Sequence, residues 1–498
     1  MYLIGFIVPI LAYFLRIWPR IINRYFGVDT WRWLYFADYL RTHHKLPKTS
    51  TDRYMIQSPF GYPPVFIYLL SLFPKHFLEK YQFLFSPFFD SLQNYLIFLA
   101  SYLFSGSILV AIVAQVVASL TLISVVESSN LNTRSLSYLL VSISLFTLIL
   151  FVISHQFVYL IIAAIVLFIL FFTHRLSLQA YLICVLALSL FTGNPIYILF
   201  FLSIFILVYI LGGKRYKLIL AEHLGSLSFW IENIDVRFAH QFRGNAKKEQ
   251  KDFVEQMYQL SVKNPIVYII GNNVWIAFLV ILLLASYFKL VSFSFPFSSS
   301  IVFILEIWTW GLVIWSVLVL WVKQMRFLGE GQRYLEYTVF PVSILLGGAA
   351  VSLFTRYGWT AEFLFITIAF GLFALTVFLQ KKTILHDRLR TVTKERWEII
   401  NYLNKSGKKD FNVAVFPVHM ADSMVYFTKG RVLLADTLPG TKGYLDVYPV
   451  ITKPMSKIVK KYRLDYVFFD RKYVTDQEIN LPKAKVIRDI DDFVLLEV

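Results

Sequence analysis

Long runs of apolar residues, separated by short polar turns, constrain this chain more than any other feature of its sequence. The hydrocarbon core of a bilayer is about 30 Å thick, so a helix that crosses it needs roughly 17–25 apolar residues. Eleven windows meet or nearly meet this length: 2–16, 82–104, 107–126, 135–153, 157–173, 177–192, 195–212, 266–288, 300–322, 338–355 and 360–380. We therefore expect an all-α, polytopic (multi-pass) domain of about eleven transmembrane helices in a cell membrane.

The composition favours the same class of protein. Hydrophobic residues make up 57% of the 498 residues and charged residues 16%, whereas soluble chains are nearer to about 45–50% apolar and about 25% charged. The first residues have no basic segment and no small-residue cleavage site, which predicts a retained helix and not a signal peptide. The net charge of +17 belongs to no nucleic-acid-binding motif. We expect the lipid bilayer as a partner and no nucleic acid.

Counting the predicted helices assigns the polar connections alternately to the two sides of the membrane. One side, which we call the bare side, holds only Lys289 and Arg356. The remaining 46 of the 48 Lys and Arg residues lie on the other side or at its membrane edge, and we call this the charged side. Cytoplasmic loops are rich in Lys and Arg, so the positive-inside rule by itself places the charged side in the cytoplasm.

The composition changes after Gln380, where charged residues become frequent. Short apolar runs then alternate with helix-like stretches, and the runs are 412–418, 431–436, 465–470 and 491–498. This alternation predicts a small soluble α/β domain over 386–498, following a membrane domain over 1–385. The tail has no phosphate loop, no metal-ligand spacing and no nucleophile elbow. We expect it to serve packing or recognition, with a contribution to the site as the alternative.

The first polar loop, 17–61, contains the first candidate for chemistry, Asp29. This carboxylate follows the first predicted membrane helix and precedes the segment 31–41. That segment has one apolar face, formed by Trp33, Phe36, Ala37 and Leu40. We therefore expect a helix that lies in the membrane interface, where a nearby base would meet a lipid-borne substrate. The alternative role for Asp29 is that of a helix N-cap.

Other polar side chains lie in three short connections on the same charged side. The candidates for binding the lipid phosphate or the sugar are Glu127, Arg134, His174, Arg175, Arg333 and Tyr334. Ionisable residues at a membrane edge are costly, and by default they mark a functional site. A carboxylate with several Arg and His residues suits an anionic lipid-phosphate substrate and acid–base chemistry. For any single Arg, the alternative role is anchoring at the membrane interface. We assign no metal ligand from these residues.

Four elements, in order, resemble the C-type (GT-C) superfamily of integral-membrane glycosyltransferases. A first membrane helix is followed by a long loop with an early acidic residue, Asp29. The helical segment 31–41 then leads to Leu46-Pro47, and Tyr62-Pro63-Pro64 precedes the next membrane helix. The helix count and the α/β tail are also similar to that superfamily, so the resemblance covers the whole layout and is sharpest over residues 1–90.

The resemblance implies an inverting glycosyltransferase that moves a hexose or pentose from a polyprenyl- or dolichyl-phosphate donor to a glycan, lipid or protein acceptor. It implies that Asp29 is the base, and that Arg134, Arg175 or Arg333 binds the lipid phosphate. In metal-dependent members the early acid is a metal ligand, so Mg²⁺ or Mn²⁺ stays open as a cofactor. The second acid of a pair is missing, because neither Asp38 nor Asp52 lies beside Asp29 in the sequence. The Trp-Trp-Asp motif of oligosaccharyltransferases is absent, which argues against asparagine glycosylation.

Two alternatives stay open beside this interpretation. The resemblance places the charged side outside the cytoplasm, in conflict with the positive-inside count; we favour the external face because a phosphate site itself needs Arg residues. The other classes of function are a transporter or flippase of a lipid-linked substrate and a non-catalytic membrane assembly protein. A transporter typically shows broken helices paired across two halves, and the sequence shows no such pairing.

Overall fold

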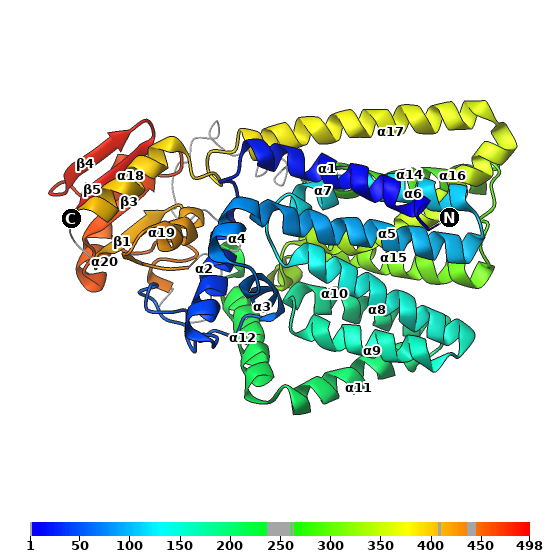
Figure 1. Cartoon of the computed structure of the whole chain (residues 1–498), viewed down its shortest axis with the longest axis horizontal. Helices are drawn as coiled ribbons and strands as arrows, with labels where there is room; N and C mark the ends of the chain where they lie inside the picture. Colours follow the sequence, from blue (N-terminus) through cyan, green and yellow to red (C-terminus); the bar gives the residue numbers. More distant parts are fainter. Residues whose placement is uncertain (1, 237–259, 261–262, 407–409, 436–444) are drawn as a thin grey trace.

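The structure is a computed structural model that describes residues 2–236, 260, 263–406, 410–435 and 445–498. It consists of a long helical bundle with an α/β domain at one end (Figure 1). Every predicted apolar window falls on a helix of the bundle. These are α1 (Ile7–Ile22), α5 (Phe85–Ser105), α6 (Ile108–Ser119), α7 (Leu122–Ser128), α8 (Arg134–Ser154), α9 (Phe157–Phe171), α10 (Arg175–Thr192), α11 (Ile196–Leu211), α14 (Pro265–Tyr287), α15 (Ser299–Trp321), α16 (Val339–Tyr357) and α17 (Trp359–Gln380).

Two of the predicted membrane passages are bent. Helix α6 meets α7 at 63°, and α11 meets α12 (Gly213–Glu232) at 119°. Among the described residues, seven helices are long and apolar enough to cross a membrane, or up to nine if each bent pair is one span. Helix α9 is apolar but shorter. The count by length and composition is therefore lower than the eleven windows. Two runs are broken and α9 is short, while α5 is long enough but carries the polar residues Asp90, Gln93 and Asn94.

Short helices fill the space between the bundle and the α/β domain. They are α2 (Val28–His43), α3 (Val65–Ser71) and α4 (Lys75–Tyr81), and α12 lies at the same end of the molecule (Figure 1). Helix α2 differs from the expected interfacial helix with one apolar face. Trp33 packs on Tyr62, with ring centroids 4.8 Å apart, while Trp31 packs on Phe427 of the α/β domain at 4.6 Å. Both tryptophans are buried, Trp33 on the expected apolar face and Trp31 on a second face that the tail covers.

The α/β domain is a five-stranded mixed sheet in the order β2-β1-β3-β5-β4. Its strands are β1 (Asn412–Phe416), β2 (Arg431–Val432), β3 (Tyr466–Asp470), β4 (Lys485–Ile490) and β5 (Phe493–Glu497), and its helices are α18 (Lys394–Lys405), α19 (Ala421–Phe427), α20 (Met455–Tyr462) and α21 (Asp476–Ile479). Strands β2, β1 and β3 are parallel, and β5 is antiparallel to both β3 and β4. Four of these strands were expected from the sequence, and β4 was not.

The first loop is attached to the edge of this sheet. The backbone N–H of Met55 donates to the carbonyl of Val432 at 2.9 Å, and that of Ile56 donates to Leu433 at 3.1 Å. An open sheet edge presents unpaired backbone groups, and covering it removes a site for unwanted strand pairing. The loop between the first two membrane helices and the C-terminal domain therefore form one packed unit.

This arrangement makes a prediction about sidedness. We expect cysteines introduced by Lys48→Cys and Lys472→Cys to react with a membrane-impermeant thiol reagent from the same side, because both exposed residues lie at the end of the bundle that carries the α/β domain. A cysteine from His155→Cys, in the turn between α8 and α9, should react from the opposite side. The native Cys184 is buried and gives little background. Labelling of all three from one side would contradict the fold.

Candidate active site

The start of α2 places Asp29 by means of a glycine. Gly27 has a φ of +126°, and a Cβ atom at this position would lie 2.3 Å from Oγ1 of Thr30 and 2.6 Å from Oδ1 of Asn130. Only glycine tolerates both that backbone conformation and that approach. Gly27 is the N-cap residue of α2, with no side-chain cap hydrogen bond. The alternative that Asp29 is the N-cap is therefore wrong, and its carboxylate lies in the first turn.

The carboxylate of Asp29 has one strong partner within its own helix. Nη2 of Arg32 donates a hydrogen bond to Oδ1 of Asp29 at 2.7 Å. The Asp29 side chain is 22% exposed, whereas that of Arg32 is 5% exposed. A buried cation therefore orients a carboxylate that solvent can still reach.

A second group of charges lies where α7 turns into α8. Arg134 forms an ion pair with Glu127, and the hydroxyl of Tyr138 donates to the buried Glu336. Arg134 also interacts electrostatically with Glu336 and Asp29. Three predicted site residues, Glu127, Arg134 and Asp29, are thus brought together with Glu336, a residue of the third polar connection on the charged side.

Arg175 and His174 lie at the start of α10, beside the Tyr62 turn. Nη2 of Arg175 donates to the carbonyl of Gly61 at 2.6 Å, and its guanidinium lies over the Tyr62 ring at 5.6 Å from the centroid. Nδ1 of His174 is 2.9 Å from Oγ of Ser177, which in turn is 2.7 Å from the hydroxyl of Tyr337. Burial, with the nearby Arg134 and Arg175 charges, lowers the pKa of His174 to about 3. Burial thus favours the neutral form of the His174 imidazole at physiological pH.

The remaining predicted residues lie in the segment before α16. Arg333 pairs with Glu330 at 2.7 Å. The hydroxyl of Tyr334 donates to Oε1 of Gln179 at 2.5 Å, and Nε2 of Gln179 is 3.2 Å from Nε2 of His223. Tyr334 is buried in this network. Its contacts join α10, α12 and the segment before α16, so its position supports the packing of the site.

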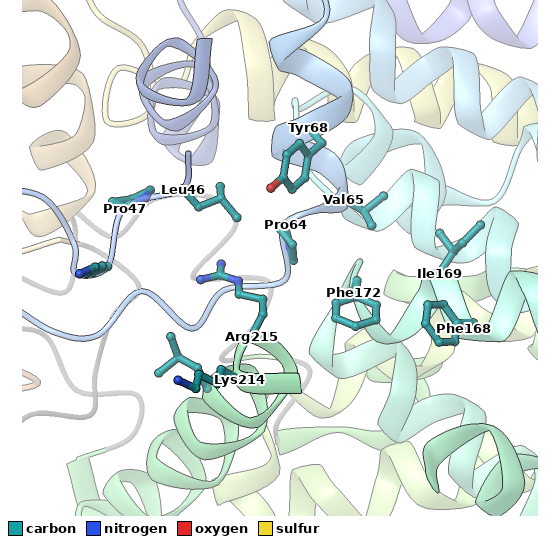
Figure 2. A pocket seen from close by; sticks show the side chains of 12 residues that line it. Leu46, Pro47, Pro64, Val65, Tyr68, Phe168, Ile169, Phe172, Lys214 and Arg215 are labelled. Atoms are coloured by element: carbon teal, nitrogen blue, oxygen red, sulfur yellow. The ribbon is translucent and has the colours of Figure 1, made fainter. Parts of the chain in front are cut away.

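A groove that the sequence analysis missed opens between the first loop, α9 and α12. Its volume is about 720 Å³. Leu46, Pro47, Pro64, Val65, Phe168, Ile169, Phe172 and Leu218 provide an apolar lining, and Tyr68, Lys48, Lys214 and Arg215 provide polar groups. Figure 2 shows the Arg215 guanidinium turned into the space between Leu46 and Pro64. In the sequence, Lys214 and Arg215 directly follow the α11 apolar run and two glycines. This pattern places two cations at the membrane edge and could have identified them as candidates.

The Tyr62-Pro63-Pro64 turn separates this groove from the Asp29 cluster. Arg215 donates to the carbonyls of Phe60 at 2.7 Å and Tyr62 at 3.0 Å, while Arg175 holds the carbonyl of Gly61. Pro64 lines the groove, and the Tyr62 ring lies against Trp33 of α2. The two guanidinium groups therefore flank one short segment, with the groove beside it and the helix of Asp29 packed against it.

Among the described residues, the acidic side chains near Asp29 are not arranged as a divalent-metal site. In the described part of the chain, no three His, Cys, Asp or Glu side chains are grouped so that they could hold a metal ion. The carboxylates nearest the site already face cations or a hydroxyl: Asp29 faces Arg32, Glu127 faces Arg134, and Glu336 faces Tyr138. The donor set seen here therefore does not fit Mg²⁺ or Mn²⁺.

The fold is similar to those of two solved membrane proteins. ArnT from Cupriavidus metallidurans matches with a TM-score of 0.59 in the apo state and 0.57 when bound to undecaprenyl phosphate. In both matches 11% of residues are identical, and the alignment covers 99% of this chain and 97% of ArnT. The archaeal oligosaccharyltransferase AglB from Archaeoglobus fulgidus, in complex with an inhibitory peptide and a dolichol-phosphate, matches with a TM-score of 0.56 and 12% identity, covering 93% of this chain and 69% of that one. No protein-family model and no curated protein matches the sequence. The resemblance to GT-C membrane glycosyltransferases is thus confirmed at the level of the fold.

The state of His174 makes a prediction about pH. Its pKa is about 3 in the folded protein and about 6.5 in an unfolded chain. The unfolded state therefore binds the proton first, and stability present above pH ~6.5 is lost, by up to about 1.4 kcal/mol per pH unit, as the pH falls towards 3. In detergent, His174→Gln should flatten the fall of the thermal midpoint between pH 7 and 4. The exposed His76→Gln should leave that slope unchanged, and equal slopes for both variants would contradict a neutral, buried His174.

Proposed function

We propose that this chain is a membrane glycosyltransferase that transfers a sugar from a polyprenyl-phosphate donor to a hydroxyl group of a glycan, lipid or protein acceptor. The observation that carries the proposal is the position of the groove. An apolar, cation-edged groove lies beside the Tyr62 turn, and α2, with a reachable carboxylate, packs against the same turn. The shared fold of ArnT and AglB, solved with undecaprenyl phosphate and dolichol-phosphate, supports this assignment.

The groove has the chemistry of a lipid-phosphate site. An isoprenoid chain needs apolar walls, which Phe168, Ile169 and Phe172 supply from α9. A phosphate needs cations, which Lys214 and Arg215 supply from the first turn of α12. The volume falls within the range of roughly 300–1,000 Å³ that is usual for ligand pockets. We therefore assign the lipid-proximal part of the donor to this groove.

The ion pairs of the arginines support a choice among them for the phosphate site. Arg134 is balanced by Glu127 and Arg333 by Glu330. Within the described residues, Arg175 and Arg215 hydrogen-bond to backbone carbonyls and form no ion pair. Arg175 is attracted by the Glu222 carboxylate without direct contact, and both guanidinium forks match phosphate oxygens. Of the three arginines expected from the sequence, we retain Arg175 and add Arg215.

The reaction follows from this placement of the donor. With the phosphate beside Arg215 and Arg175, the sugar extends past Tyr62 towards Asp29. The acceptor oxygen attacks the anomeric carbon from the face opposite the phosphate, the bond from that carbon to the phosphate oxygen breaks, and configuration inverts. Asp29 takes the proton of the acceptor hydroxyl, while the arginines stabilise the charge on the departing lipid phosphate.

We place this end of the molecule on the extracytoplasmic side. A lipid-phosphate site itself requires cations, which accounts for part of the Lys and Arg excess that the positive-inside rule would otherwise assign to the cytoplasm. The α/β domain is a folded unit, and such domains cross membranes largely regardless of their charge. The accessibility of the Lys48→Cys and Lys472→Cys thiols in intact cells decides this point.

The role of Asp29 is tested by Asp29→Asn. Asparagine keeps the size of the side chain and can still accept a hydrogen bond from Arg32, but it cannot accept a proton. We expect the purified variant to fold with an unchanged thermal midpoint and to lose roughly 10²–10⁴-fold in transfer rate, the usual contribution of a general base. Asp38→Asn, in the same helix and paired with Arg41 and Lys75, is the matched control. Wild-type transfer by Asp29→Asn would remove it from the mechanism.

The groove is tested by Lys214→Ala, which removes an exposed cation. We expect the KM for the polyprenyl-phosphate-linked donor to rise several-fold while kcat changes little, because a phosphate contact made equally in the ground and transition states affects binding alone. Lys217→Ala is the matched control: this lysine is exposed on the same helix, lies outside the groove and contacts the Tyr209 ring at 5.1 Å. Equal donor KM values for both variants would place the phosphate elsewhere.

A further inference from the structure

A buried carboxylate of the α/β domain reaches the helix that carries Asp29. Asp422 lies in the first turn of α19, and its side chain is 0% exposed. Its Oδ1 accepts a hydrogen bond from the Tyr54 hydroxyl at 2.8 Å, and its Oδ2 lies 3.7 Å from Nη1 of Arg32. The other terminal nitrogen of Arg32, Nη2, donates to Asp29. One guanidinium group therefore lies between a carboxylate of the tail and the proposed base.

We propose that Asp422 is a positioning residue for the transfer reaction, which holds Arg32 from the α/β domain and, through Arg32, sets the direction of the Asp29 carboxylate. The inference rests on the proposed function and extends the site into the C-terminal domain. A guanidinium is planar, and its two terminal nitrogens point in fixed directions. With Nη1 facing Asp422 and Nη2 bonded to Asp29, rotation of the fork is restricted at both ends. The Trp33 ring, whose centroid is 4.9 Å from Cζ of Arg32, restricts its tilt.

The α/β domain is attached firmly enough to serve this purpose. Arg53 donates to the carbonyls of Val425 at 2.9 Å and Thr428 at 2.7 Å, so the first loop caps the C-terminal end of α19. Lys/Arg donors at this end of a helix satisfy carbonyls that lack helical partners. The same loop donates from Met55 to Val432 beside the sheet edge. Together with the hydrogen bond from Tyr54 to Asp422 at the start of α19, these contacts fix Asp422 relative to α2.

The location of Asp422, in the helix that follows the central strand β1, also favours a functional role. Strand β1 is parallel to both neighbours, with β2 on one side and β3 on the other. The connections after β1 and β3 thus leave in opposite directions, and crevices at such points are where open α/β sheets bind ligands. Here α19, which follows β1, packs on α2. The sheet therefore contacts the membrane domain through α19, the helix that follows β1.

A kinetic experiment tests positioning. Asp422→Asn keeps the shape and the hydrogen bond from Tyr54 but removes the charge that faces Arg32. We expect kcat to fall about 10–100-fold with the donor KM unchanged within about twofold, because a displacement of about 1 Å costs on the order of 100-fold in rate. Asp422→Glu should recover part of the loss, because it restores the charge. Asp470→Asn is the control, as this aspartate is also buried and ends the neighbouring parallel strand β3. Wild-type kcat for Asp422→Asn would overturn the inference.

A stability experiment tests the shared arginine without any activity. If Asp29 and Asp422 both stabilise Arg32, either single Asn variant leaves one carboxylate beside it, and the double variant leaves neither. The fall in thermal midpoint of Asp29→Asn/Asp422→Asn should then exceed the sum of the single falls, since a buried cation is left without its carboxylates. In an Arg32→Met background the falls should become additive. Additive falls in the native background would overturn the inference, whether or not the wild-type protein transfers sugar. If the wild-type protein transfers no sugar but the falls in thermal midpoint are more than additive, only the proposed function is contradicted.

Discussion

Backbone N–H and C=O groups find no water inside a bilayer, and the rest of this structure follows from that constraint. Only helices satisfy these groups within one segment, so each apolar window becomes a helix. Most charged side chains lie at the ends of the bundle, and one end carries almost all of them. That end is also the one where α2, α12 and the α/β domain lie (Figure 1).

The places where helices break supply functional groups. The bend between α6 and α7 brings Glu127 towards Arg134, and the bend between α11 and α12 brings Lys214 and Arg215 to the groove. Inside the bundle the first bend is supported by a buried polar cluster. Asp90 pairs with Arg16 of α1 and accepts a hydrogen bond from Ser124 of α7 at 2.6 Å. Buried charges persist in such a setting only when they are paired, and here the pairing fixes the helix that carries Glu127.

The C-terminal domain is more than a soluble appendage of the bundle. It covers α2, shields Trp31 from solvent and places Asp422 beside Arg32. Helix α2 therefore has a second buried face, against the α/β domain, beside the apolar face expected from the sequence. Arg32 does not belong to the expected apolar face, and in the fold it lies with Trp31 on the side of α2 that packs against the second domain.

The sequence by itself determined the membrane-spanning architecture, the shared end of the charged residues and most of the α/β tail, because hydropathy and local periodicity are properties of neighbouring residues. It also marked Asp29 through its place between two helices. Strand β4 was missed because its residues are mostly exposed and show no apolar run. The tertiary structure alone decided that Arg175 and Arg215 flank one turn, that Arg134 is balanced by Glu127, and that Tyr54 meets Asp422 across 368 positions. Such contacts depend on how distant segments pack, and a single sequence carries no local pattern that encodes them.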